Sequence, residues 1–177
     1  MSERLSLSAR LAAKPPEPWF FIRWLNMNTK TIEPLAHDQP YTDDHIAAYP
    51  VEYIAGIDLY NAGEFHAAHD VWEERWMGEV GPQEKLFLQA MIQSAVAFHH
   101  LEIGRPGAAR QMYTRAKEKF EKLGTNVFMS LDLIKYQQQL DCCLSWLLTA
   151  ADPRELTPPQ IEPPRISLLR ELSDYDS

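Results

Sequence analysis

A chain of 177 residues is long enough for one domain with tails, or at most two very small domains. Hydrophobic residues make up 45% and charged residues 24%, as in globular proteins, and no apolar run could cross a bilayer. The net charge of −8 argues against a nucleic-acid surface, which needs clustered lysine and arginine. We therefore expect a cytoplasmic protein without a membrane or nucleic-acid partner.

The first 43 residues are expected to form an irregular arm, because they contain several prolines and no sustained periodicity. An aromatic cluster within the arm is too apolar to remain in water, so we expect it to dock on the domain or on a partner. The arm could also support a homodimer, the commonest oligomer. Met27 is a second candidate start, which would place residues 1–26 outside the native protein. The cluster consists of Trp19, Phe20, Phe21, Trp24 and Leu25.

Residues 44–150 are expected to form a helical domain, because glycines are few and alternating, strand-like segments are absent. Glycine and proline divide this stretch into five predicted helices. We place them at about 51–62, 64–77, 83–103, from the turn at 104–106 to 124, and from a cap at Thr125 or Asn126 to 150.

The last predicted helix contains the adjacent Cys142 and Cys143, whose geometry does not favour a disulfide. Both are expected to be reduced, in keeping with the cytoplasm. Residues 151–177 are rich in proline and predict an extended tail, with one short helix at 166–172 as an option.

An internal echo relates the first two helices to the next two. Ala67 and Ala68, followed by Trp72, recur at a constant offset as Ala108 and Ala109, followed by Tyr113. Small residues let antiparallel helices approach closely, and the aromatic ring fills their splayed end. The sequence therefore predicts an all-α fold, a compact five-helix bundle of two tetratricopeptide-like antiparallel hairpins plus a covering C-terminal helix.

The second helix has a buried face with a polar edge. On a helical wheel at about 100° per residue, Trp72 and Trp76 lie on the apolar face. His69 falls on the edge of that face, and Glu73 lies one turn further on, beside it. This edge is the first half of a candidate polar cluster.

The third helix is apolar over nearly its whole circumference, which predicts that other helices surround it. Gln89, Gln93 and His100 nevertheless share one narrow sector of its wheel. An unpaired buried amide or imidazole costs roughly 1–3 kcal/mol, so these residues need partners. We expect His69 and Glu73 to supply them, with Gln89 nearby.

Three interpretations of this cluster stay open. It could be a structural hydrogen-bond network that fixes the register of the hairpins. It could hold a divalent metal through His69, Glu73 and His100, although the carboxylate-rich pairs of di-iron bundles are absent. It could be a ligand pocket in which Glu73 is a base and His69 or His100 its partner. The candidate ligand contacts are Gln89, Gln93, Trp72 and Trp76.

Other polar residues carry weaker indications. His66 and His99 fall outside the candidate polar cluster on the wheel and are expected to be surface or interface histidines. Arg105 and Arg110 could meet an anion at a helix N-terminus, but Pro106 leaves fewer N–H donors there. No serine–histidine–aspartate order, glycine-rich phosphate loop or nucleotide fingerprint is present, and no cofactor is evident.

The second and third helices also contain two coupled motifs. Residues 59–76 read LYNAGEFHAAHDVWEERW, and residues 88–100 read LQAMIQSAVAFHH, followed by Gly104 and Gly107. Together they resemble domain-of-unknown-function family 309 over about residues 53–124. The resemblance implies a compact all-α bundle in the cytosol or, in plants, the plastid.

Carried over by position, the family's polar residues coincide with the predicted cluster. The chain departs from the family pattern at Tyr60, Asp70 and Arg105, the last of which puts any role of that turn in doubt. The family implies no established activity. The residues concerned are His69, Glu73, Gln93 and His100.

The leading functional hypothesis is a non-catalytic helical module that binds a protein or a small molecule. The alternative is a metal-assisted or acid–base enzyme, hydrolase-like, that acts at His69, Glu73 and His100.

Overall fold

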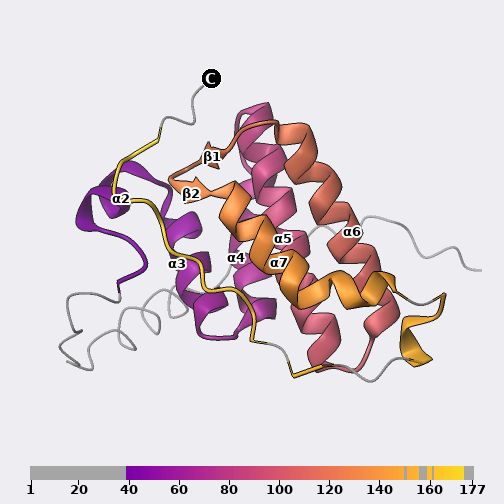
Figure 1. Cartoon of the computed structure of the whole chain (residues 1–177). Coiled ribbons are helices and arrows are strands. Elements are labelled where there is room, and N and C mark those ends of the chain that lie inside the picture. Colours follow the sequence, from indigo (N-terminus) through magenta and orange to yellow (C-terminus); the bar gives the residue numbers. More distant parts are fainter. Residues whose placement is uncertain (1–38, 150, 156–158, 161, 174–177) are drawn as a thin grey trace, which may run out of the picture. The chain divides into compact units, whose positions relative to one another are not determined.

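The computed structural model describes residues 39–149, 151–155, 159–160 and 162–173. This part of the chain is mostly helical, with one two-stranded hairpin (Figure 1). The all-α prediction is confirmed, whereas the tetratricopeptide-like character of the hairpins stays a prediction. The predicted aromatic cluster at 19–25 lies outside the described residues. None of the described helices is long and apolar enough to cross a membrane.

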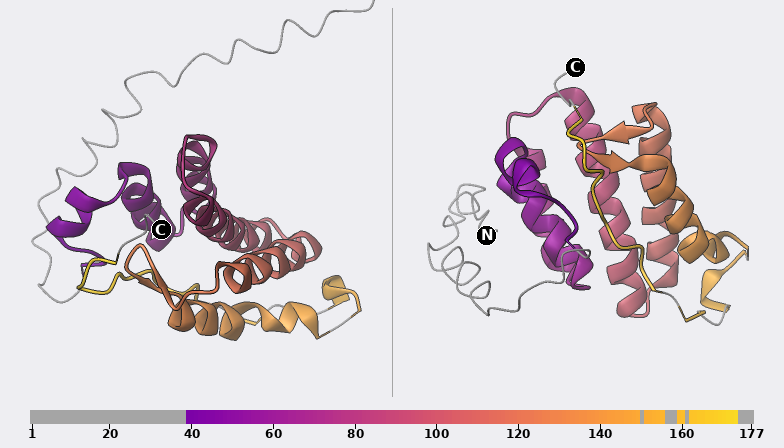
Figure 2. Two further views of the ribbon diagram at one scale, coloured as in Figure 1. Left: turned by 90° about the horizontal axis from the view of Figure 1, so that it is seen from above. Right: turned by 60° about the vertical axis from the view of Figure 1, so that its left-hand side comes forward.

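Four helices follow one another as packed neighbours, α3 on α4, α4 on α5 and α5 on α6 (Figures 1 and 2). Their ends lie within two residues of those expected from glycine and proline positions. Gly63 and Gly104 make the turns after α3 and α5 with φ of 81° and 69°, a region that other residues avoid. The helices are α3 (Val51–Asn61), α4 (Phe65–Met77), α5 (Pro82–Glu102) and α6 (Pro106–Leu123).

α3 and α4 pack tightly where Gly56 meets Trp72. A Cβ atom at Gly56 would lie 2.0 Å from Nε1 of Trp72, so no larger residue fits unless the indole moves. That Nε1 donates a hydrogen bond of 3.2 Å to the carbonyl of Tyr53. Trp72 is fully buried, and its ring centroid lies 6.0 Å from that of Tyr60. Packing of the Trp72 ring directly on the backbone of Gly56 therefore fixes how α3 and α4 lie against each other.

The last long helix begins later than predicted. α7 spans Leu133–Leu144 and continues into a short 3-10 helix, η2 (Ser145–Leu148). A hairpin of β1 (Val127–Phe128) and β2 (Leu131–Asp132) occupies the residues where the sequence predicted the first turns of this helix. The prediction of one helix from 126 to 150 was therefore wrong at its start.

The hairpin turn explains this error. Met129 and Ser130 have φ of 45° and 57°, in the left-handed region where such turns normally place glycine or asparagine. The sequence therefore carries no ordinary turn signal here. Asp132 then caps α7, because its Oδ1 accepts the backbone N–H of Lys135 at 2.9 Å.

Two short helices were not predicted. α2 (Asp43–Ala48) precedes α3, and η3 (Pro153–Glu155) follows η2. Fully buried His45 stabilises the start of α2, because its Nδ1 accepts the N–H of Thr42 at 3.0 Å. A helix of one or two turns gives too little periodicity to be detected in the sequence.

Residues 162–173, which we call the C-terminal strap, are extended. The predicted option of a helix at 166–172 was wrong. Pro164, Ile166 and Leu168 are buried while the residues between them are exposed, a strand-like period of two. In Figure 2 the strap, in yellow, runs along the helices towards the β1–β2 hairpin.

Candidate functional site

His69 of α4 lies between two carboxylates. Its Nδ1 is 2.8 Å from Oδ1 of Asp70, and its Nε2 is 3.9 Å from Oε2 of Glu73. The side chain is 24% exposed, so solvent reaches it. An imidazole held in this way is oriented and can exchange a proton or a hydrogen bond with a ligand. The predicted His69–Glu73 edge therefore exists, and the exposed Asp70 joins it.

Close to His69, two other histidines make a contact between α4 and α5. The ring centroids of His66 and His99 lie 5.1 Å apart, edge to face. His66 also lies 5.8 Å from His69, and His99 lies 6.1 Å from His100. His66 and His99, which were expected to lie outside the polar cluster, thus link the two helices. Together with His69 and His100 they form one group of four histidines.

Gln93 and His100 do not supply hydrogen bonds to the α4 edge. Within the described residues, Oε1 of Gln93 and Nδ1 of His100 are buried without a hydrogen-bond partner. His99 faces α4, and the next residue on a helix points about 100° away. His100 therefore does not face α4 as His99 does, and the expected hydrogen bonds with His69 and Glu73 do not form.

The predicted ligand contacts separate into buried and accessible side chains. Trp72 is fully buried in the core and cannot contact a ligand from outside. Trp76 and Gln89 are half-buried. Nε1 of Trp76 is a third buried polar atom without a partner among the described residues, and Nζ of Lys85 lies 5.5 Å from its ring centroid.

The described residues contain no group of three or more histidine, cysteine, aspartate or glutamate side chains arranged to hold a metal ion. The predicted metal ligands His69, Glu73 and His100 therefore do not form such a group. The histidine group at the α4–α5 contact has the chemistry for proton transfer and hydrogen bonding.

Burial lowers the pKa of His100, and the nearby His99 and Arg105 lower it further. The folded protein thus binds fewer protons at this site than the unfolded chain, whose histidine pKa is about 6.5. The stability that neutral His100 contributes is present above about pH 6.5 and is lost as the pH falls below it.

We therefore expect the wild type to lose more stability between pH 8 and pH 5.5 than His100→Gln, which cannot titrate. Urea unfolding at both pH values measures the difference, and His66→Gln, altered at an exposed histidine, is the control. Equal losses for the wild type and His100→Gln would remove His100 from this pH dependence.

A second group of polar residues, which holds the strap, was not predicted from the sequence, because these residues bind backbone atoms. Asn61 binds Ile166 twice: Nδ2 donates to its carbonyl and Oδ1 accepts its N–H, both at 2.8 Å. Ser130 accepts the N–H of Leu169 at its carbonyl, at 2.7 Å. The only sequence signal was the short alternation of apolar residues at 164, 166 and 168.

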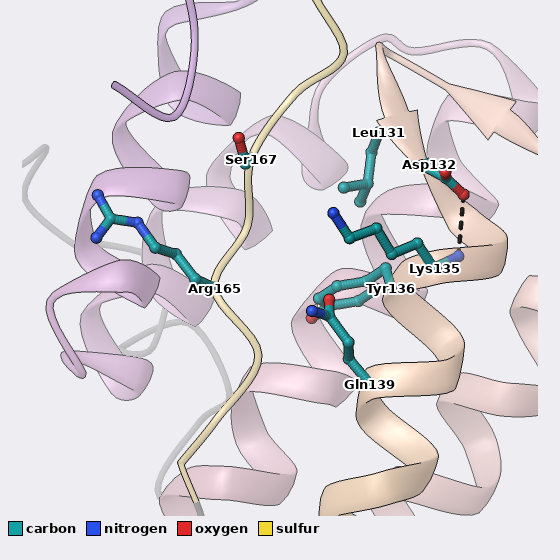
Figure 3. Close-up of a pocket in the computed structure, with 7 residues that line it drawn as sticks. All are labelled: Leu131, Asp132, Lys135, Tyr136, Gln139, Arg165 and Ser167. Atoms are coloured by element: carbon teal, nitrogen blue, oxygen red, sulfur yellow. Dashed lines mark hydrogen bonds between the residues drawn. The ribbon is translucent and has the colours of Figure 1, made fainter. Parts of the chain in front are cut away.

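A small pocket lies between the strap and α7 (Figure 3). Its volume is about 30 Å³, which is space for one or two water molecules. It therefore cannot hold a substrate. Its lining residues are Leu131, Asp132, Lys135, Tyr136, Gln139, Arg165 and Ser167.

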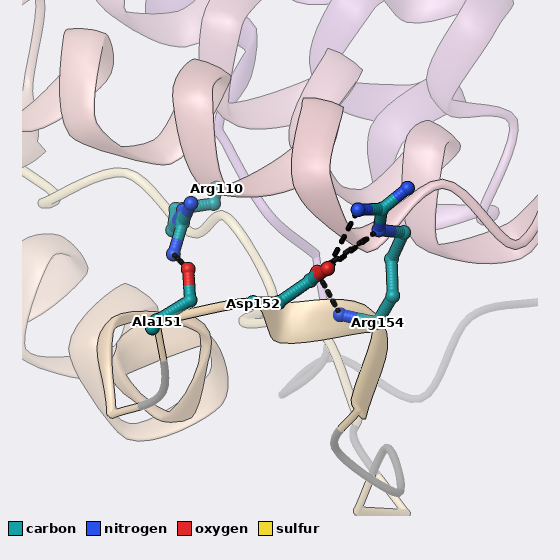
Figure 4. Close-up of polar contacts among 4 residues, drawn as sticks. All are labelled: Arg110, Ala151, Asp152 and Arg154. Carbon is teal, nitrogen blue, oxygen red and sulfur yellow. Dashed lines mark hydrogen bonds and ion pairs between the residues drawn. The ribbon is translucent and has the colours of Figure 1, made fainter.

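Arg110, a candidate anion contact, is used to hold the chain after η2. Its Nη1 donates to the carbonyl of Ala151 at 3.1 Å (Figure 4). Beside it, hydrogen bonds from the side chain and backbone of Arg154 lower the pKa of Asp152 to about 2. The Arg110 contact anchors Ala151 to α6. Arg105, the other candidate anion contact, is exposed.

The fold and the polar group together define an all-α protein with a histidine–carboxylate face on α4 and α5. A model of the family described as Domain of unknown function (DUF309) matches residues 53–112. The predicted resemblance to this uncharacterised family is confirmed over the matched residues. No curated protein matches the chain. The matched segment contains all of α4 and α5, whereas Ser130 and the strap lie outside it.

Proposed function

We propose that the protein is a non-catalytic binding module whose recognition surface is the outer side of the α4–α5 pair. One observation carries the proposal: Trp76 Nε1, Gln93 Oε1 and His100 Nδ1 are buried on this pair without a partner among the described residues. Each unpaired group costs roughly 1–3 kcal/mol. The side chains that carry these atoms are only half-buried, so a change of rotamer brings the atoms to a ligand that supplies one acceptor and two complementary polar groups.

The spacing of these groups favours a protein segment over a small molecule as the ligand. Gln93 and His100 are two helical turns apart, about 10 Å along α5, and Lys85 lies about as far before Gln93. Two exposed apolar side chains lie at opposite ends of α5, Met77 before it and Ile103 after it, 68% and 46% exposed. Protein interfaces combine apolar contacts with hydrogen bonds from polar groups.

An acid–base enzyme is the second candidate, and the position of His69 between Asp70 and Glu73 favours it. In this mechanism Asp70 orients the imidazole and the opposite ring nitrogen exchanges the proton. The two candidates depend on different residues. The enzyme requires His69, whereas the binding module requires Gln93 and His100.

Stability measurements test whether the unpaired atoms serve the fold or a ligand. We expect Gln93→Leu to stabilise the isolated protein by about 1 kcal/mol, because it removes a buried polar atom that has no partner. Urea unfolding measures the change, and Gln139→Leu on α7 is the matched control. A loss of stability in Gln93→Leu would mean that this side chain belongs to a structural network.

Ligand binding is tested by a photo-crosslinking residue placed at Gln89, compared with one at exposed Glu118 of α6. We expect a crosslinked partner at Gln89 alone, at least tenfold weaker in Gln93→Leu and His100→Ala and unchanged in His69→Asn. Loss in His69→Asn alone would favour the enzyme. Equal crosslinking at both positions would contradict the proposed surface.

A further inference from the structure

The strap is held chiefly by contacts to its backbone. Asn61 binds both the N–H and the carbonyl of Ile166. The N–H of Leu168 donates to the carbonyl of Pro40 at 2.7 Å, and that of Leu169 to the carbonyl of Ser130. Backbone contacts of this kind recognise any extended segment, so side-chain selectivity comes from the buried positions at 164, 166 and 168.

Ser130 uses every polar atom it has to bind the strap. Its Oγ donates to the carbonyl of Glu171 at 2.8 Å, and its N–H donates to Oγ of Ser173 at 2.6 Å. Its side chain also lies 2.6 Å from the hydroxyl of Tyr49, which donates to the carbonyl of Ser173 at 3.0 Å. Tyr49 and Ser130 both lie outside the strap. When the strap leaves, a hydroxyl proton that was donated to it forms the Tyr49–Ser130 hydrogen bond, which keeps the site assembled.

The backbone at Ser130 is strained for a non-glycine residue, and so is that of Met129. Strain of this kind persists where the surrounding structure requires it, and it is concentrated at ligand contacts and switch regions. Here the turn aims the N–H, carbonyl and hydroxyl of one serine at an extended segment. The conformation of the hairpin turn therefore favours binding of the strap at a cost in the stability of the hairpin itself.

Docking of the strap is only weakly favourable in free energy. It orders twelve residues in return for three buried apolar side chains, and Leu169 and Leu172 remain 40% and 51% exposed. The backbone entropy lost is large compared with so small a buried surface. Segments with this balance are the first to open in a native protein.

We propose that Tyr49, Asn61 and Ser130 form a peptide-binding site that the strap occupies as an intramolecular ligand. The ligand in trans is an extended segment of a partner protein with apolar side chains at alternate positions, like Pro164, Ile166 and Leu168. The tethered strap competes at a high effective concentration, so it sets a threshold for partner binding. This site uses none of the residues of the α4–α5 surface and is independent of the proposed function.

The test uses a fluorescent peptide with the sequence of residues 162–173 and the full-length chain. Fluorescence anisotropy compares the wild type with Ile166→Asp/Leu168→Asp, whose strap is weakened. We expect at least tenfold tighter binding to the double variant. Adding Asn61→Ala should abolish this gain, whereas adding the exposed control Asn126→Ala should not. Equal binding by all variants would overturn the proposal.

A second measurement needs no variant. In the wild type, saturating peptide should accelerate hydrogen exchange at the amides of Ile166, Leu168 and Leu169, because it displaces the strap, and should leave α5 unchanged. Unchanged exchange at these three amides would refute displacement. A concentration-dependent dimer that the peptide dissociates would overturn the assignment to a partner protein and give the site to a second copy of the chain.

Discussion

Gly56→Ala is expected to destabilise the protein by about 3 kcal/mol or more. The new methyl group would lie 2.0 Å from Nε1 of Trp72, and that ring is fully buried, so it has no free space to enter. Overpacking of a tight core costs about 1–3 kcal/mol. Displacing the indole also breaks its hydrogen bond to the carbonyl of Tyr53, which adds about 1 kcal/mol or more.

Thermal and urea unfolding of Gly56→Ala measure this loss. The matched control is Gly107→Ala in α6, where a Cβ meets nothing within 4 Å. That change should be neutral or stabilising by up to about 1 kcal/mol, because alanine favours a helix over glycine. If the two variants were equally stable, close packing of α3 on α4 would not be what Gly56 provides.

Arg75→Ala should cost about 3 kcal/mol, the second large effect. Nε and Nη2 of Arg75 donate to the two carboxylate oxygens of Glu84 at 2.8 and 3.2 Å, which links the end of α4 to the start of α5. The Glu84 side chain is only 5% exposed. Removing the arginine leaves a buried carboxylate without this partner, and such losses are typically 3–5 kcal/mol.

A double-mutant cycle separates the ion pair from the packing around it. Arg75→Met/Glu84→Leu replaces both charges with apolar groups of similar size and should recover more than half of the loss. Arg115→Ala, at an exposed position on α6, is the control and should change stability by less than about 0.5 kcal/mol. A double variant as unstable as Arg75→Ala would show that the arginine acts through other contacts.

The sequence predicted the α3–α6 stack well because its boundaries are marked by residues with strong backbone preferences. Pro82 and Pro106 begin helices, and Gly63 and Gly104 make turns at positive φ. Local chemistry of this kind can be read without any tertiary structure. The β1–β2 turn has no such mark, because Met129 and Ser130 adopt left-handed backbone that their side chains disfavour.

The candidate site shows a different limit. A helical wheel groups Gln93 with His100, but it does not give the rotation of α5 about its own axis relative to α4. That rotation brings His99 and not His100 against His66. The strap contacts were beyond prediction for another reason. The side-chain amide of Asn61 binds the backbone N–H and carbonyl of Ile166. Because every residue has such backbone groups, this contact leaves almost no pattern in the sequence.

The strap also has a kinetic consequence. Contacts within the α3–α6 stack join neighbours along the chain, whereas Asn61 and Ile166 are 105 positions apart, and Tyr49 and Ser173 are 124 apart. Helical hairpins with local contacts fold quickly, and distant contacts must await closure of a long loop. Strap docking is therefore the last step of refolding, and a chain caught before it has a formed helical stack with the peptide-binding site open.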